Sequence, residues 1–325
     1  MESRTVAWEG AHIAILPVFA SAAVVSGRDR RDPGDGRLTG LEKRRKIQAA
    51  WMTSGHKLAN SRPALAEGRE RRGIYVNDAG AKLKLGWGYF LFQFVTVMIV
   101  YFAASAPPAF IWGEMRDGEL ILSSTGAAVS VASSMAGALF VAWLWLRRDR
   151  AVAQAWDLRT PSVGWPKTLG VAVLATIAII GWFTLGSMLV EQMGLQTPDV
   201  VEVLGWVTQS QFHFILWIVL VAVFAAGLGE ELLWRGFLMD RMERVAGLAG
   251  RAWLIILIQG ILFGLPHLYQ GWGGVIITGV VGLGLGWLRY NRKGNLWALI
   301  IAHIAVDVIM MSLAYADKLG FMPPT

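Results

Sequence analysis

Long uncharged stretches dominate the chain from residue 86 onward. Seven apolar segments alternate with polar loops, and several reach or approach the roughly 20 residues that a helix needs to cross a bilayer. We expect helices over residues 86–106, 123–146, 169–190, 211–229, 252–266, 271–290 and 296–315. The predicted fold is therefore an all-α, polytopic bundle of about seven to eight membrane-spanning helices.

The first 84 residues have a different character. An apolar run at residues 13–25 is short and interrupted by Pro17. It resembles a signal peptide, with Ala20-Ser21-Ala22 as a cleavage site, or else a loose peripheral segment. We favour the second interpretation, because export would put the basic stretch that follows on the wrong side of the membrane. Two regions result: a basic, mostly disordered cytoplasmic extension at residues 1–84 and a transmembrane domain at residues 85–325.

Basic residues in the loops predict the orientation. The loops at 147–168, 235–251 and 289–293 carry several Lys and Arg each, whereas those at 107–122, 191–210 and 268–272 carry one, none and none. Cytoplasmic loops are enriched in Lys and Arg. We therefore expect a multi-pass integral protein of a bacterial cell membrane, with its N-terminus in the cytoplasm and its C-terminus outside.

Composition narrows the possible partners. Of the residues, 55% are hydrophobic and 16% are charged, against about 25% charged in soluble domains. The net charge of +7 comes from the N-terminal extension, where residues 28–84 hold 15 basic and 7 acidic residues. No nucleic-acid-binding module accompanies this charge, so we expect the lipid bilayer and no nucleic acid as a partner. The chain has no Cys, which leaves His and carboxylates as metal ligands.

Three short motifs carry ionisable side chains at or near the ends of apolar segments. Glu230-Glu231 is followed by Arg235, Phe263 is followed by His267, and His303 is followed by Asp307. Residues four apart share a helix face, so Glu231 and Arg235 are expected to pair. Glu230 is rotated away from Glu231 and is left to face a cavity. Ionisable residues inside a membrane indicate a functional site.

These residue types suit hydrolysis of a peptide bond inside a membrane. The reaction needs a base that activates water and donors that hold the developing oxyanion. A carboxylate serves as the base, and two imidazoles serve as donors, as a second base or as metal ligands. Glu230, His267 and His303 also form a workable zinc set with water in the fourth position. The sequence leaves a metal site and a metal-free site both open.

Together, the ordered motifs resemble the three signature motifs of the CPBP family, which contains CaaX-prenyl proteases of type II and the abortive-infection proteins. The resemblance covers roughly residues 200–312. It implies an intramembrane endopeptidase that cleaves membrane-associated protein substrates, with CaaX proteins as the substrates of some relatives. By this analogy Glu230 activates water with help from His267. His303 and residue 307 hold the oxyanion, and Glu231 with Arg235 supports the site beside Phe263.

Asp307 departs from the pattern of the CaaX-cleaving relatives, which have Asn at this position. An ionised Asp has no proton to donate to an oxyanion. Three alternatives follow: Asp307 is protonated, it orients His303, or a metal is present.

A distance along the chain also needs an explanation. His267 lies 16 residues beyond Arg251, roughly 24 Å along an ideal helix, yet it must meet Glu230 near the other helix end. We expect the fourth helix to continue past Arg235 and the fifth to end at Pro266 within the membrane. Two other functions compete with the protease: a non-catalytic membrane immunity or scaffold protein, and an ion or metal transporter. No internal repeat supports the transporter.

Overall fold

A computed structural model describes residues 74–75, 84–116 and 118–321 of the chain. The predictions made for residues 1–73, including the apolar run at 13–25, lie outside the described residues. The elements in chain order are β1 (Ile74–Tyr75), β2 (Lys84–Leu85), α2 (Trp87–Trp112), β3 (Gly113–Arg116), β4 (Glu119–Leu122), α3 (Ser124–Arg148), α4 (Val152–Ala155), α5 (Trp165–Gln192), α6 (Val201–Val207), α7 (Gln211–Trp217), η1 (Ile218–Leu238), α8 (Met239–Met242), α9 (Ala252–Gly264), η2 (Leu265–Gln270), α10 (Gly271–Asn291) and α11 (Trp297–Lys318).

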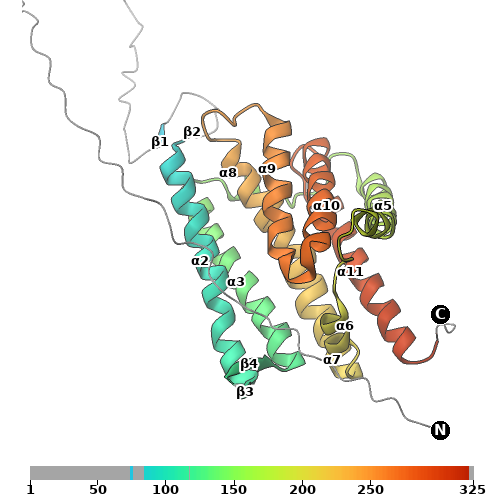
Figure 1. The fold of residues 1–325 in the computed structure, drawn as a ribbon. Helices are drawn as coiled ribbons and strands as arrows, with labels where there is room; N and C mark the ends of the chain where they lie inside the picture. The colour runs from blue at the N-terminus through green and yellow to red at the C-terminus, as the bar shows by residue number, and fades with distance from the viewer. Residues whose placement is uncertain (1–73, 76–83, 117, 322–325) are drawn as a thin grey trace, which may run out of the picture. The chain divides into compact units, whose positions relative to one another are not determined.

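All seven predicted apolar segments are helical, so the prediction of a helical membrane bundle is confirmed. Six stretches of the described chain are long and apolar enough to cross a membrane. One of them, Ala252–Asn291, contains two of the predicted segments, α9 and α10, joined by the 3₁₀ turn η2. These two helices lie side by side and run in opposite directions (Figure 1).

The bundle is a chain of packed helix pairs. Helix α2 packs on α3, α3 on η1, η1 on α11, and α11 on α5, while α10 contacts both α9 and α5 (Figure 1). Large apolar side chains remain exposed on the outside, among them Phe102 on α2 and Leu174 on α5. Small and polar side chains such as Ala138 and Ser134 of α3 are buried instead. This distribution fits helices that face lipid, because small residues let helices approach closely in a bilayer.

Two short stretches differ from the sequence prediction. Helix α2 runs through Pro107 and Pro108 to Trp112, and an antiparallel hairpin of β3 and β4 then leads into α3. A Pro is tolerated in a membrane helix when neighbouring structure satisfies the freed backbone groups. The hairpin pairs Gly113 with Leu122 and Arg116 with Glu119, which shortens the loop that we expected over residues 107–122.

The loops rich in Lys and Arg gather at one end of the bundle. Asp149, the C-cap of α3, accepts hydrogen bonds from Arg241 of α8 at 2.8 Å and from Gln93 of α2 at 2.9 Å. At the same end the backbone of Asp157 pairs with that of Asn295. This gathering agrees with the alternation expected from the positive-inside rule.

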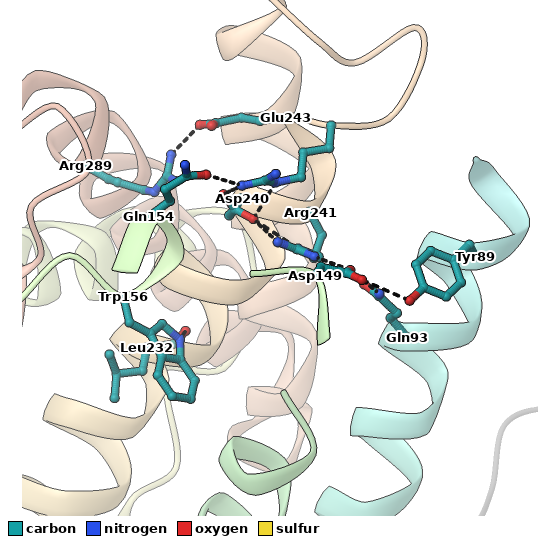
Figure 2. A network of polar contacts seen from close by, with 11 residues as sticks. Tyr89, Gln93, Asp149, Gln154, Trp156, Leu232, Asp240, Arg241, Glu243 and Arg289 are labelled. Carbon is teal, nitrogen blue, oxygen red and sulfur yellow. Dashed lines mark hydrogen bonds and ion pairs between the residues drawn. The ribbon is translucent and has the colours of Figure 1, made fainter. Parts of the chain in front are cut away.

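A set of buried polar contacts holds this end together. We call Gln93, Asp149, Asp240, Arg241 and Arg244 the bracing network (Figure 2). Both Arg241 and Arg244 donate to the carboxylate of Asp240, at distances of 2.8–3.0 Å for the longer bonds. All five side chains are buried. Buried charges are tolerated when they are paired and hydrogen-bonded, and this network ties α2, α3 and α8 into one unit.

Candidate active site

The two adjacent carboxylates lie on one long helical run from Gln211 to Met242, formed by α7, η1 and α8. The expectation that the fourth helix continues past Arg235 is therefore confirmed. Within the run, Ile218–Leu238 has the wider turns of a π-helix, a geometry that is rare and concentrated at functional sites. Gly227 and Gly229 let this run pack closely on α11 and α3, because an added Cβ would clash with the side chains of Ile304 and Met135 respectively.

Glu231 and Arg235 form the expected pair across one turn. Arg235 Nη1 donates to Glu231 Oε1 at 2.9 Å, and both side chains are fully buried. The Arg235 guanidinium also lies over the ring of Phe263 on α9, 4.0 Å from its centroid, which is a cation–π contact. Leaving either partner of such a buried pair without the other would be strongly destabilising.

The same carboxylate oxygen holds His303 of α11. His303 Nδ1 lies 2.9 Å from Glu231 Oε1, and His303 Nε2 lies 3.9 Å from Glu230 Oε2. Because Arg235 donates to that oxygen as well, Glu231 acts as an acceptor and His303 donates from Nδ1. The Glu230 side chain is 21% exposed and that of His303 is 14% exposed. Glu231 is thus the buried anchor, and Glu230 is the accessible carboxylate.

Asp307 lies one turn beyond His303 on the same face of α11. Its Oδ2 is 3.8 Å from His303 Nε2, and its side chain is 26% exposed. The second carboxylate therefore flanks the imidazole nitrogen that faces Glu230. This position favours the alternative in which Asp307 orients His303. We refer to Glu230, Glu231, Arg235, His303 and Asp307 as the acid–histidine cluster.

Phe263 lies between His267 and the acid–histidine cluster and contacts both histidine rings. Helix α9 ends at Gly264 and the 3₁₀ turn η2 carries His267, so the fifth helix does end next to Pro266 as expected. His267 Nδ1 donates to the carbonyl of Phe263 at 3.1 Å. The Phe263 ring lies 5.5 Å from the His267 ring and 6.4 Å from the His303 ring, between centroids. The three motifs are therefore adjacent in space.

Close glycine packing sets the position of this turn. A Cβ added at Gly264 would lie 3.0 Å from the Cα of Gly279, and one added at Gly282 would lie 3.1 Å from the Cα of Gly260. Helices α9 and α10 consequently touch backbone to backbone. The sequence-based interpretation of the Gly-rich sixth segment as a packing surface fits this contact.

Two tyrosines near the cluster were not identified from the sequence. Tyr101 of α2 and Tyr269 of η2 both interact electrostatically with Glu230. Tyr269 follows His267 by two residues, which is a usable signal, whereas nothing in the sequence connects Tyr101 with the motifs. His213 bonds with Ser210 and Thr125 instead.

Metal coordination is the other chemistry that the sequence left open. In the part of the chain that the structure describes, no group of three or more His, Asp and Glu side chains has an arrangement that could hold a metal ion. Glu230, His267 and His303, the predicted zinc set, therefore do not fit a metal in this geometry. Both imidazoles direct Nδ1 to protein acceptors, the carbonyl of Phe263 and the carboxylate of Glu231, which leaves Nε2 of each ring open.

Comparison with known families bears directly on this arrangement. Residues 212–309 match the model of a family described as Type II CAAX prenyl endopeptidase Rce1-like. This segment is Rce1-like. It contains all three motifs, from Glu230 to Asp307, so the resemblance to the CPBP proteases is confirmed. No match was found among curated proteins or among solved structures.

The Rce1-like segment and the helices together show an integral membrane protein. The match supports a protease of the intramembrane CAAX type in general, with substrates that are themselves membrane proteins. Six apolar helical stretches surround or carry the segment. The residues upstream of 212 contribute α3 and α5, which pack on the helices of the matched segment, and α2, which packs on α3.

Proposed function

We propose that this protein is a metal-free intramembrane endopeptidase in which Glu230 activates the attacking water. The observation that carries the proposal is the 3.9 Å approach of Glu230 Oε2 to His303 Nε2, with His303 held by the buried Glu231–Arg235 pair. Glu230 and Asp307 are the more exposed carboxylates of the cluster. A water placed against Glu230 and a substrate carbonyl placed against His303 Nε2 would meet a base and a donor respectively.

Glu230 begins the reaction as the general base. It takes a proton from water while the water oxygen bonds to the carbonyl carbon of the substrate. The proton then passes from Glu230 to the nitrogen of the leaving amine as the carbon–nitrogen bond breaks. His267 is proposed to assist Glu230. Because its Nδ1 proton is donated to the Phe263 carbonyl, neutral His267 presents Nε2 as an acceptor for the same water.

His303 stabilises the oxyanion. Its Nδ1 proton is committed to Glu231, so Nε2 carries a proton only in the imidazolium form. We infer that His303 acts as an imidazolium and donates from Nε2 to the tetrahedral intermediate. Asp307 then keeps this imidazolium oriented rather than donating to the oxyanion itself. This division of roles accounts for an Asp at a position where CaaX-cleaving relatives have Asn.

The substrates are proposed to be membrane-associated proteins with CaaX-like C-termini, by analogy with the family. The test compares protein termini in membranes of cells that produce the wild type or Glu230→Gln, followed by cleavage of a synthetic farnesylated CaaX peptide by the purified full-length protein. Glu230→Gln should lower cleavage by about 10²- to 10⁴-fold, the usual contribution of a general base. Its melting temperature should stay unchanged, because none of the described contacts of Glu230 is closer than the 3.9 Å to His303.

Glu202→Gln is the matched control, because it makes the same change on the exposed face of α6. It should cleave like the wild type. If Glu230→Gln leaves all termini and peptide cleavage unchanged, the protease proposal is wrong, and a membrane scaffold or immunity protein becomes the better interpretation. Cleavage of other membrane proteins without cleavage of the CaaX peptide would retain the protease and reject the CaaX substrate.

A further inference from the structure

A cavity of about 450 Å³ lies at the Lys/Arg-rich end of the bundle, away from the acid–histidine cluster. Its walls come from α4, the residue after α8, the start of α9 and the end of α10. The side chains that matter are Gln154, Glu243, Arg289, Tyr290 and Lys293. Its volume falls within the range of about 300–1,000 Å³ that is typical of ligand pockets.

The position of this cavity places it at a membrane–water boundary. Helix α9 begins at Ala252 and α10 ends at Asn291, and the two belong to one stretch that is apolar enough to enter a bilayer. The cavity therefore lies beside the first residues of α9 and the last residues of α10. Basic pockets between membrane helices at the cytoplasmic side are sites where phosphorylated lipid headgroups bind.

Arg289 supplies the central donor. Its side chain is 5% exposed, and its Nη1 donates to Glu243 Oε1. Its Nε is buried and has no hydrogen-bond acceptor among the described residues. Buried guanidinium N–H groups are rarely left without an acceptor. Arg289 therefore lines the cavity with donor capacity beyond its bond to Glu243.

Lys293 adds a second positive charge at the mouth. It is exposed and takes part in no ion pair among the residues described. With Arg289 it outweighs the single carboxylate of the lining, Glu243, which already pairs with Arg289. The cavity consequently favours an anion over a cation.

The bracing network holds one wall of the cavity in place. Gln154 Oε1 accepts a hydrogen bond from Arg244 at 2.7 Å, so the amide nitrogen of Gln154 is the part of this side chain that can still donate to a ligand (Figure 2). Arg244 is fixed in turn by Asp240. A wall fixed by its own hydrogen bonds binds a ligand at lower entropic cost.

We propose that this cavity binds a phosphate group, carried either by the headgroup of an anionic phospholipid or by a soluble phosphate compound. Guanidinium and ammonium groups are the usual protein partners of phosphate, and a guanidinium edge can grip two phosphate oxygens. Donors from Gln154, Arg289 and Lys293 converge on the cavity. The site is independent of proteolysis, so its test does not depend on the proposed protease function.

The test measures melting temperature of the purified full-length protein in a neutral detergent. The added probes are short-chain phosphatidylglycerol, short-chain phosphatidylcholine and inorganic phosphate, each over a range of concentrations. Lys293→Asn removes the charge, and Asn accepts the left-handed conformation of Lys293, whose φ is 54°. Lys318→Asn on α11 is the matched control for loss of one Lys elsewhere.

The expected result is a melting temperature that rises with phosphatidylglycerol more than with phosphatidylcholine. The apparent affinity should fall about tenfold in Lys293→Asn, the effect of one charge-assisted hydrogen bond, and stay unchanged in Lys318→Asn. An equal response to inorganic phosphate would assign the site to soluble phosphate compounds.

The proposal is overturned if the wild type responds equally to both lipids and not to phosphate, or if Lys293→Asn and Lys318→Asn behave alike. If Lys293→Asn does not fold, native mass spectrometry of lipids retained by the wild type decides: preferential retention of anionic lipid supports the site, and its absence rejects it.

Discussion

Two polar clusters on the same helical run, Gln211–Met242, are built in opposite ways. In the bracing network both oxygens of Asp240 accept hydrogen bonds from arginines, and Asp149 Oδ2 accepts from Arg241 and Gln93, at 2.8–3.0 Å. In the acid–histidine cluster two of the carboxylate–imidazole separations are 3.8 and 3.9 Å. Glu231 Oε2 there has no partner among the described residues.

This difference separates stabilising charges from reactive ones. A cluster that supports the fold satisfies every buried charge, because a lone buried charge is costly. A cluster that acts on a substrate must leave donors and acceptors that the substrate can use. The open contacts therefore belong to the cluster whose carboxylates are partly exposed, and the closed contacts belong to the buried network. Three substitutions test this division, and a fourth tests an ion pair outside both clusters.

Arg241→Met should have the largest effect, and it should act on folding alone. It leaves Asp149 and Asp240 buried without one of their partners, which is expected to cost about 3–5 kcal/mol of unfolding free energy. Denaturation in detergent measures the loss, and cleavage per folded molecule should stay unchanged. Arg251→Met, on an exposed residue, is the control. A stability within about 1 kcal/mol of wild type would show that the network does not brace the bundle.

His303→Gln should lower cleavage by about 10²-fold or more, because it removes the proposed oxyanion donor. It also removes the hydrogen bond to Glu231, with a stability loss of about 1.5–3 kcal/mol. Cleavage rate and melting temperature together separate the two effects. His213→Gln, on a histidine that bonds with Ser210 and Thr125, should change neither. Normal turnover in the His303 variant would remove His303 from the mechanism.

Asp307→Asn should change cleavage by less than about tenfold, or about 1.4 kcal/mol. The amide can still contact His303, while Glu231 continues to hold the other ring nitrogen. Steady-state cleavage of the same peptide measures the change, with Asp317→Asn on the same helix as the control. A loss of a hundredfold would indicate that the Asp307 charge takes part directly in the reaction.

Asp157→Asn should have the smallest effect, a slight loss of stability at neutral pH that disappears in acid. Hydrogen bonds from the Arg159 side chain lower the pKa of Asp157. A carboxyl whose folded pKa is depressed contributes stability above its unfolded pKa of about 3.9, and that contribution disappears as pH falls through the folded pKa. The wild type should therefore lose melting temperature slightly more than the variant between pH 6 and pH 3. Parallel curves for the two proteins would contradict this.

Much of the fold could be predicted from the sequence because apolar segments of span length have few alternatives in a membrane. The positions of the seven helices follow from hydropathy, and the adjacency of the three motifs follows from the resemblance. The continuation of the fourth helix past Arg235 was also predictable, because Glu230 and His267 could not otherwise meet.

The bracing network could not be predicted in the same way. Arg241 and Arg244 counted only as loop charges, whereas both are buried. Asp149, the partner of Arg241, lies at the end of α3, about 90 residues earlier in the chain. Sequence spacing carries no signal for a contact over that separation. The π-helical turns around Glu230 were missed for a related reason. Helical periodicity in the sequence assumes α-helical turns, so the wider geometry of Ile218–Leu238 had no signature.

The contact of α9 with α10 has a consequence for how this molecule can change. At Gly264 and Gly279 the two helices meet through main-chain atoms. Main-chain atoms cannot change rotamer, so they cannot make room for an added side chain. The position of His267 relative to α10 is therefore set by this backbone contact rather than by side-chain packing. Substitutions on the lipid-facing sides of α9 and α10 are therefore tolerated, whereas a single methyl group added where the two helices touch would displace the His267 ring.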